Sequence, residues 1–142
     1  MAASIVETQV TWASASSKTV SAATIQWSDA MSCTVLDDAY QLQISADNAG
    51  TPASGDTCVV YLARTTGDIL GDTGNDFDSD EHAEWVMTLD TYATNTPGED
   101  PARKTVPVDL RGCTGYKVGV ICANAATRNI VVRARMSCER PV

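Results

Sequence analysis

The segment LGDTGNDFDSDEH, residues 70–82, has the residue types of a catalytic or metal-binding site. It holds four aspartates, one glutamate and the only histidine of the chain. Two neighbouring carboxylates can share a proton in acid–base chemistry, and clustered carboxylates can bind a hard cation such as Ca²⁺. The segment therefore raises two hypotheses, a carboxylate dyad at Asp72 and a calcium site.

The tripeptide Asp72-Thr73-Gly74 matches the signature of aspartic proteases. In a dimeric protease of the retroviral type, one such aspartate from each subunit shares a proton with its twin. Here Asn75 stands where that pattern has alanine or serine, Gly71 interrupts the preceding apolar run, and three more aspartates follow. A dyad works at low dielectric with few neighbouring charges. A dimeric protease is therefore the less favoured alternative, and a glycine-containing turn is the simpler interpretation.

Alternating aspartates suit a calcium ion, because clustered carboxylates repel one another when no cation is bound. The D-x-D-x-D spacing departs from an EF-hand, since Glu81 replaces its glycine and Met87 its bidentate glutamate. An irregular calcium loop and a solvated acidic loop that faces a basic surface both stay open. The candidate calcium ligands are Asp72, Asp76, Asp78 and Asp80.

Two further residues have the types used in acid–base and nucleophilic catalysis. His82 lies near Glu81 and Glu84 as a candidate general base, and Cys113 is a candidate nucleophile. Neither lies in an activating context, because the chain has no Gly-x-Ser-x-Gly elbow, phosphate-binding glycine loop or His-Glu-x-x-His motif. The sequence thus predicts a protein that is not an enzyme and that needs no cofactor apart from the calcium considered above.

The segments that must position these residues alternate apolar and polar side chains with a period of two, which is typical of half-buried strands. The pattern predicts about eight strands, at VETQVTW, KTVSAATIQWS, YQLQISA, DTCVVYLAR, EWVMTLDTY, KTVPVDL, YKVGVICA and NIVVRARMS. The expected fold is all-β: one antiparallel, jelly-roll-like β-sandwich domain over residues 1–142, with residues 1–12 as a candidate N-terminal arm.

Several strands carry further information. DTCVVYLAR is apolar on both alternating faces, so Val59 and Tyr61 are expected to be covered by a second layer or a partner. The change of parity within KTVSAATIQWS predicts a bulge or a corner between two sheets. Trp12, Trp27 and Trp85 each lie on the apolar parity of a strand, which favours core packing over the exposed stacking of a glycan-binding module.

The composition, 44% hydrophobic and 20% charged, is that of a globular protein. The start of the chain lacks a basic stretch followed by an apolar run, and no apolar run approaches about 20 residues. We therefore expect no leader and no membrane contact, and a protein that stays where it is made. The five cysteines are odd in number and lie mostly in apolar runs, which predicts buried thiols in a reducing compartment.

The net charge of −8 hides an asymmetry. Residues 1–102 carry 16 acids against two bases, a balance of −14, whereas residues 103–142 carry eight bases against two acids, a balance of +6. Such a split favours attraction within one fold or between neighbouring copies. Arg133 and Arg135 lie on one strand face and are, with Val59 and Tyr61, the candidate interface residues. Nucleic acid is disfavoured as a partner unless the basic strands form one uncovered patch.

The stretch from GDTCVVYLARTTGDILGD to KTVPVDL, followed by GYKVGVICANAATRNIVVRARMS, resembles small virion proteins of tailed bacteriophages, in particular head decoration or cement proteins. The resemblance lies in the layout of nearly the whole chain: small residues at the start, many Ala, Ser, Thr, Gly and Asp residues, and short strands with a strand pair at the end. It implies a non-enzymatic protein, made in the host cytoplasm and located on the capsid surface. Its sandwich would form a homodimer or homotrimer and bind the major capsid protein. A calcium- or glycan-binding sandwich, for example in a phage tail or receptor-binding part, is the alternative.

Overall fold

The computed structural model describes residues 3–20, 24–48, 55–67, 69–70, 80–91, 102–122 and 130–142. In these ranges the chain is almost entirely β-strand, with one short 3-10 helix, η1 (Asp80–His82), which confirms the all-β prediction. The strands are β1 (Ala3–Gln9), β2 (Lys18–Val20), β3 (Gln26–Trp27), β4 (Met31–Ser32), β5 (Asp38–Asn48), β6 (Thr57–Thr65), β7 (Glu84–Asp90), β8 (Ala102–Pro107), β9 (Gly115–Cys122) and β10 (Ile130–Pro141).

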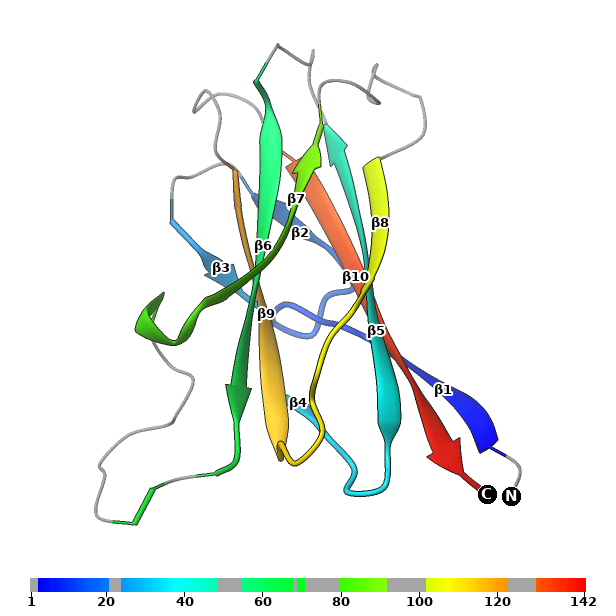
Figure 1. Ribbon diagram of the computed structural model, residues 1–142. Coiled ribbons are helices and arrows are strands. Elements are labelled where there is room, and N and C mark those ends of the chain that lie inside the picture. Colours follow the sequence, from blue (N-terminus) through cyan, green and yellow to red (C-terminus); the bar gives the residue numbers. More distant parts are fainter. Residues whose placement is uncertain are drawn as a thin grey trace.

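The strands form two antiparallel five-stranded sheets that pack face to face as a β-sandwich (Figure 1). The first sheet has the order β1-β10-β5-β8, with β2 beside the other half of β10. The second sheet has the order β3-β9-β6-β7, with β4 beside the other half of β9. Each of the pairs β1/β2 and β3/β4 therefore acts as one interrupted strand. The resulting four-plus-four order is that of a jelly roll, as the alternating pattern predicted.

The segment KTVSAATIQWS, in which the apolar alternation changes parity, forms a corner between the two sheets. Val20 of β2 lies opposite Ile130 of β10 in the first sheet. Gln26 of β3 lies opposite Val120 of β9 in the second sheet. The chain thus passes from one layer of the sandwich to the other between these strands, and the expected corner is confirmed.

The core consists of the alternating apolar residues that point between the sheets. Ile44 and Val132 from the first sheet and Val60 and Val118 from the second are fully buried. Burial of such side chains stabilises a fold by about 1.5–3 kcal/mol each. Trp12 is 3% exposed and belongs to this core, as its position predicted.

The prediction of a core position is wrong for Trp85. Val60 lies opposite Met87 and Tyr61 lies opposite Trp85, so Val86 is an extra residue of β7 with no partner on β6. Such a β-bulge shifts the alternation of side chains by one. Val86 packs against the core, and Trp85 is turned to the outer face, where its side chain is 64% exposed. Trp27 is half-buried, also on the outer side of the second sheet.

Within the candidate N-terminal arm, residues 1–12, strand β1 covers residues 3–9, whereas Val10 and Trp12 are buried in the core. The seven residues of β1 pair antiparallel with β10 of the same chain, so the two termini lie side by side (Figure 1). All of these residues except Val6 are exposed. Residues 3–9 are therefore an edge strand of the chain's own first sheet.

Candidate functional site

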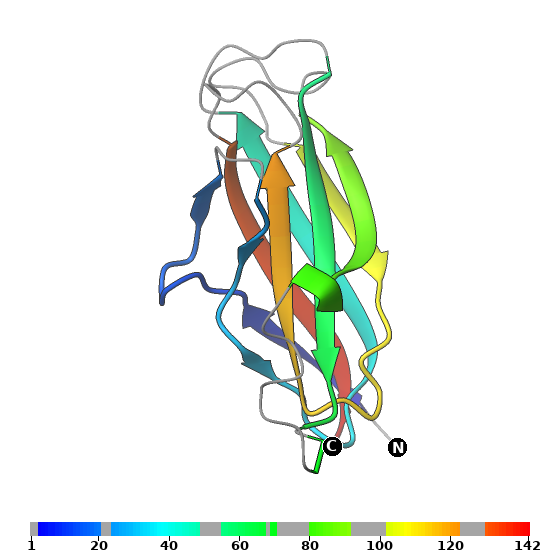
Figure 2. The same cartoon turned by 90° about the vertical axis from the view of Figure 1, so that its left-hand side faces the viewer.

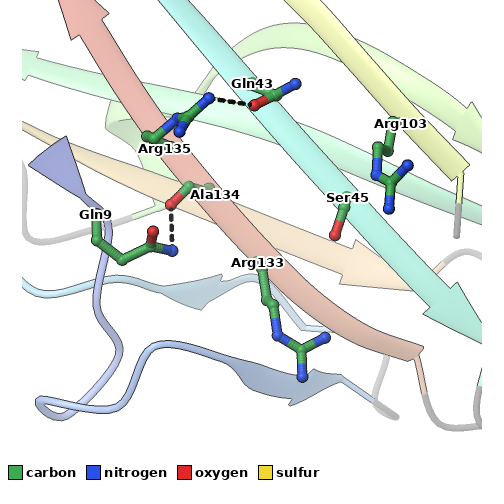
Figure 3. A pocket seen from close by; sticks show the side chains of 7 residues that line it. All are labelled: Gln9, Gln43, Ser45, Arg103, Arg133, Ala134 and Arg135. Carbon is green, nitrogen blue, oxygen red and sulfur yellow. Dashed lines mark hydrogen bonds between the residues drawn. The ribbon is translucent and has the colours of Figure 1, made fainter. Parts of the chain in front are cut away.

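The first candidate site is a shallow groove on the outer face of the first sheet (Figure 3). It arises because Ser45 of β5 lies between Arg103 of β8 and Arg133 of β10 in the strand register. Arg135 is two residues further along β10 and therefore points to the same side of the sheet. The groove has a volume of about 250 Å³, and we call it the arginine groove. Its lining residues are Gln9, Gln43, Ser45, Arg103, Arg133, Ala134 and Arg135.

Polar contacts hold only one side of this groove in place. Arg135 donates a hydrogen bond to Gln43 Oε1 at 3.1 Å, and Gln9 Nε2 donates to the carbonyl oxygen of Ala134 at 3.0 Å (Figure 3). Arg135 also donates to Glu7 Oε2 at 3.4 Å. Arg103 and Arg133 form no ion pair with another residue in the described ranges. Both side chains belong to exposed residues. The groove therefore offers two guanidinium groups whose charge no described carboxylate neutralises.

Other C-terminal arginines have partners within the chain. Arg140 donates to both carboxylate oxygens of Asp37 at 2.8 Å, and this contact holds the pKa of Asp37 below its ordinary value. Arg111 donates to Asp38 at 2.7 Å and lowers the pKa of that exposed carboxylate in the same way. The charge split of the sequence is thus partly compensated inside the fold. In the arginine groove, by contrast, no described carboxylate forms an ion pair with Arg103 or Arg133.

The second candidate site is the outer face of the second sheet. Trp27, Gly119, Tyr61 and Trp85 lie opposite one another in successive strands, β3, β9, β6 and β7. Directly opposite residues share a face of a sheet, and we call these four residues the aromatic row. Val59 lies on the same face of β6 and, like Tyr61, is half-buried. The four predicted interface residues therefore divide between the two outer faces: Val59 and Tyr61 on one, Arg133 and Arg135 on the other.

The residues considered for catalysis also meet on the second sheet. His82, Glu84 and Cys113 line one hollow of about 540 Å³, although they are far apart in the sequence. Both carboxylate oxygens of Glu84 accept hydrogen bonds from Arg64, at 2.7 and 2.8 Å. Glu84 is therefore held by a guanidinium group, and this contact raises the pKa of Arg64. The Arg64–Glu84 ion pair therefore lines the hollow together with His82 and Cys113.

Of the four proposed calcium ligands, only Asp80 belongs to the described residues. Asp72, Asp76 and Asp78 lie outside them. Asp80 Oδ1 accepts a hydrogen bond from Trp27 Nε1 at 2.9 Å, which attaches η1 to the outer face of the second sheet (Figure 2). Within the described ranges no three His, Cys, Asp or Glu side chains are grouped to bind a metal ion. The calcium site and the dyad at Asp72 remain predictions.

The five cysteines are free thiols, as predicted. Cys58 and Cys122 lie opposite each other on β6 and β9 and are buried, as is Cys138 of β10. Burial raises the pKa of the Cys58 thiol to about 12 and that of the Cys122 thiol to about 11. Cys33 and Cys113 are half-buried. The buried thiols therefore stay protonated at neutral pH.

The described part of the chain contains no helix that is long and apolar enough to cross a membrane. No protein-family model matches the sequence, and no curated protein matches it. The candidate functions therefore rest on the two outer faces themselves.

Proposed function

We propose that the protein is a non-enzymatic virion structural protein of a tailed bacteriophage, a decoration protein that docks on the capsid shell through the arginine groove. The observation that carries this proposal is that Arg103 and Arg133 form no ion pair with any described carboxylate, on a chain whose net charge is −8. Guanidinium groups that lack an internal partner favour contact with carboxylates of another protein, since Arg forms paired hydrogen bonds with them.

The position of the groove supports docking by a rigid surface. Arg103 and Arg133 project from strands on either side of β5, in the middle of the first sheet. Strand pairing fixes the relative positions of the two backbones, so docking must order only the arginine side chains and not the segments that carry them. Contacts of this kind, repeated over many capsid subunits, act multivalently even when each is weak.

Homo-oligomerisation uses the same charge asymmetry. Residues 66–84 contain seven acids and no base, and Asp80 lies on the outer side of the second sheet. The arginine groove lies on the outer face of the first sheet, so attraction between Asp80 and the groove acts between copies rather than within one. A dimer or trimer stabilised in this way is consistent with the proposed decoration role.

Nucleic acid is the competing partner, because the arginines do share one exposed patch. Tight binding to phosphates requires several cations that are not already paired. Arg135 is paired with Glu7 at 3.4 Å, and the net charge of −8 would repel a nucleic acid. We therefore propose an acidic protein surface as the partner.

The test is co-sedimentation with empty shells of the major capsid protein encoded in the same genome, together with the mass of the free protein by light scattering. We expect co-sedimentation at 50 mM NaCl, a marked loss at 500 mM NaCl, and a solution mass of two or three chains. Arg133→Glu should weaken shell binding at least tenfold. Arg111→Glu, the control, makes the same change of charge away from the groove and should leave binding within twofold. A monomer that does not bind shells, or one that binds duplex DNA instead, would contradict the proposal.

A further inference from the structure

Trp85 is an exposed aromatic side chain on a rigid strand. It is 64% exposed, whereas Trp12 is buried in the core and Trp27 is half-buried. Its indole N–H donates to Thr88 Oγ1 at 3.1 Å, so the only polar group of the side chain has a partner inside the protein. The surface that Trp85 presents to solvent is therefore its apolar ring, and the bulge at Val86 is what places it there.

Trp27 lies flat at the other end of the aromatic row. A Cβ atom on Gly119 would lie 2.8 Å from Cε3 and Cζ3 of Trp27, so the ring rests directly on the backbone of β9. Its indole N–H is held by Asp80 Oδ1 at 2.9 Å. Tyr61 lies between Gly119 and Trp85 in the register. Neighbouring strands are about 4.8 Å apart, so the row extends roughly 14 Å across the sheet.

A hollow with fixed polar groups lies next to Trp85. It has a volume of about 210 Å³ and lies where β7, the edge of the second sheet, meets the end of β8, which Figure 2 shows side by side. Arg64 and Glu84 line it together with Asp109, and Arg64 Nη1 also donates to the carbonyl oxygen of Asp109 at 3.0 Å. The guanidinium and carboxylate groups are thus held in fixed positions beside an exposed aromatic ring.

This combination fits a sugar ring. A pyranose presents C–H groups on its faces and hydroxyl groups at its rim, so it matches an apolar aromatic surface next to fixed donors and acceptors. A protein partner fits less well, because a stable interface covers about 800 Å² on each side and one tryptophan supplies about 150–250 Å². The ligand is expected to be uncharged, since Asp80 lies beside Trp27 and the chain, with its net charge of −8, would repel an acidic sugar.

We propose that the aromatic row and the Arg64–Glu84 hollow form a binding site for a neutral polysaccharide. One sugar unit stacks on Trp85, and its hydroxyl groups exchange hydrogen bonds with Arg64 and Glu84. Adjacent units extend across Tyr61 towards Trp27, which favours a polymer over a monosaccharide. This site does not overlap the arginine groove, because no residue of the aromatic row or of the hollow beside Trp85 lines that groove. It gives a capsid-surface protein a means of attachment to glycans.

The experiment is affinity electrophoresis of the whole chain in gels that contain β-glucan, xylan, galactomannan or an α-glucan, followed by calorimetry with oligosaccharides of the retarding polymer. We expect retardation by at least one of these polymers. Trp85→Ala should weaken the affinity at least tenfold while the melting temperature changes by less than about 2 °C, since the ring is exposed. Leu36→Ala, which removes another exposed apolar side chain, is the matched control and should leave the affinity within twofold.

Three outcomes would overturn the proposal. The first is that none of the four polymers retards the wild-type protein. The second is that Trp85→Ala and wild type are retarded equally. The third is that Trp85→Ala converts an oligomer into a monomer and no polymer binds, which would assign the row to a contact between copies. Arg133→Glu should keep its full affinity for the polymer, so failure of the arginine groove and failure of this site can be told apart.

Discussion

The two outer faces of the sandwich differ in chemistry although they cover one core. The outer face of the first sheet carries glutamine, serine and arginine side chains around a groove in which Arg103 and Arg133 form no ion pair with a described residue. The outer face of the second sheet carries tryptophan, tyrosine and valine, and the Arg64–Glu84 ion pair lies at the edge of this sheet, where Arg64 also contacts the carbonyl oxygen of Asp109. Inward-facing residues are apolar in both sheets. The comparison shows that the core determines the fold, whereas the outward alternation leaves each face free to acquire its own binding chemistry.

The largest expected effect comes from a change that damages both faces together. Ile44→Ala removes a fully buried side chain of β5 and leaves a cavity between the sheets. We expect a loss of about 2–5 kcal/mol in the free energy of unfolding, measured by urea denaturation. Shell binding and polysaccharide binding should then fall in parallel as the temperature approaches the lowered melting point. Loss of one activity alone would mean that the faces do not depend on a common core.

A smaller effect should be confined to the second face. Gly119→Ala places a methyl group where Ile25 Cγ2 and the ring of Trp27 now lie, at 2.7 and 2.8 Å, so the indole must move and its bond to Asp80 is strained. We expect a loss of about 1–3 kcal/mol in stability and weaker polysaccharide binding, with shell binding unchanged. Trp27→Leu in the same chain removes the ring that the methyl group meets. The double variant should therefore lose less stability than the sum of the losses in the two single variants. A loss equal to that sum would contradict the packing described for Gly119.

The smallest effect concerns the ion pair that anchors the end of β10 in the first sheet. Because Arg140 holds the pKa of Asp37 below the unfolded value near 3.9, this carboxylate stabilises the fold fully above about pH 4 and loses that contribution as the pH falls through its folded pKa. Asp37→Asn should lower the melting temperature at pH 7 by about 5 °C. The difference from wild type should shrink below pH 4 in thermal scans from pH 2 to 7.

The control for that pair is Asp38→Asn. It breaks the contact with Arg111, in which both side chains are more than half exposed, and should change the melting temperature by about 1 °C or less. Equal effects of Asp37→Asn and Asp38→Asn would show that burial of Asp37 does not matter to the stability of the first sheet.

Much of the fold followed from the period-two pattern, because a residue's parity determines which side of a strand it occupies. Leu42, Ile44, Val118 and Val120 are buried where alternation predicts them. Trp85 is the instructive failure, since the bulge at Val86 depends on how β6 and β7 pair and not on the residues of β7 alone. The irregular alternation at Val86 in EWVMTLDTY was the available signal.

The candidate sites were predictable only in part. Arg133 and Arg135 alternate on one strand, so their common face follows from the sequence. Arg103 joins them because β8 pairs with β5, and the pairing of strands distant in the chain is a property of the topology. The same holds for the aromatic row, whose four members lie on four different strands and meet only through the pairing of those strands.

The most direct test of the account is one crossed binding measurement. Wild type, Arg133→Glu and Trp85→Ala are each titrated against empty capsid shells and against the polysaccharide that retards the wild type. We predict that Arg133→Glu loses shell binding at least tenfold and keeps polysaccharide binding, and that Trp85→Ala does the reverse. If both variants lose the same activity, or if neither activity depends on either residue, the assignment of separate functions to the two faces is contradicted.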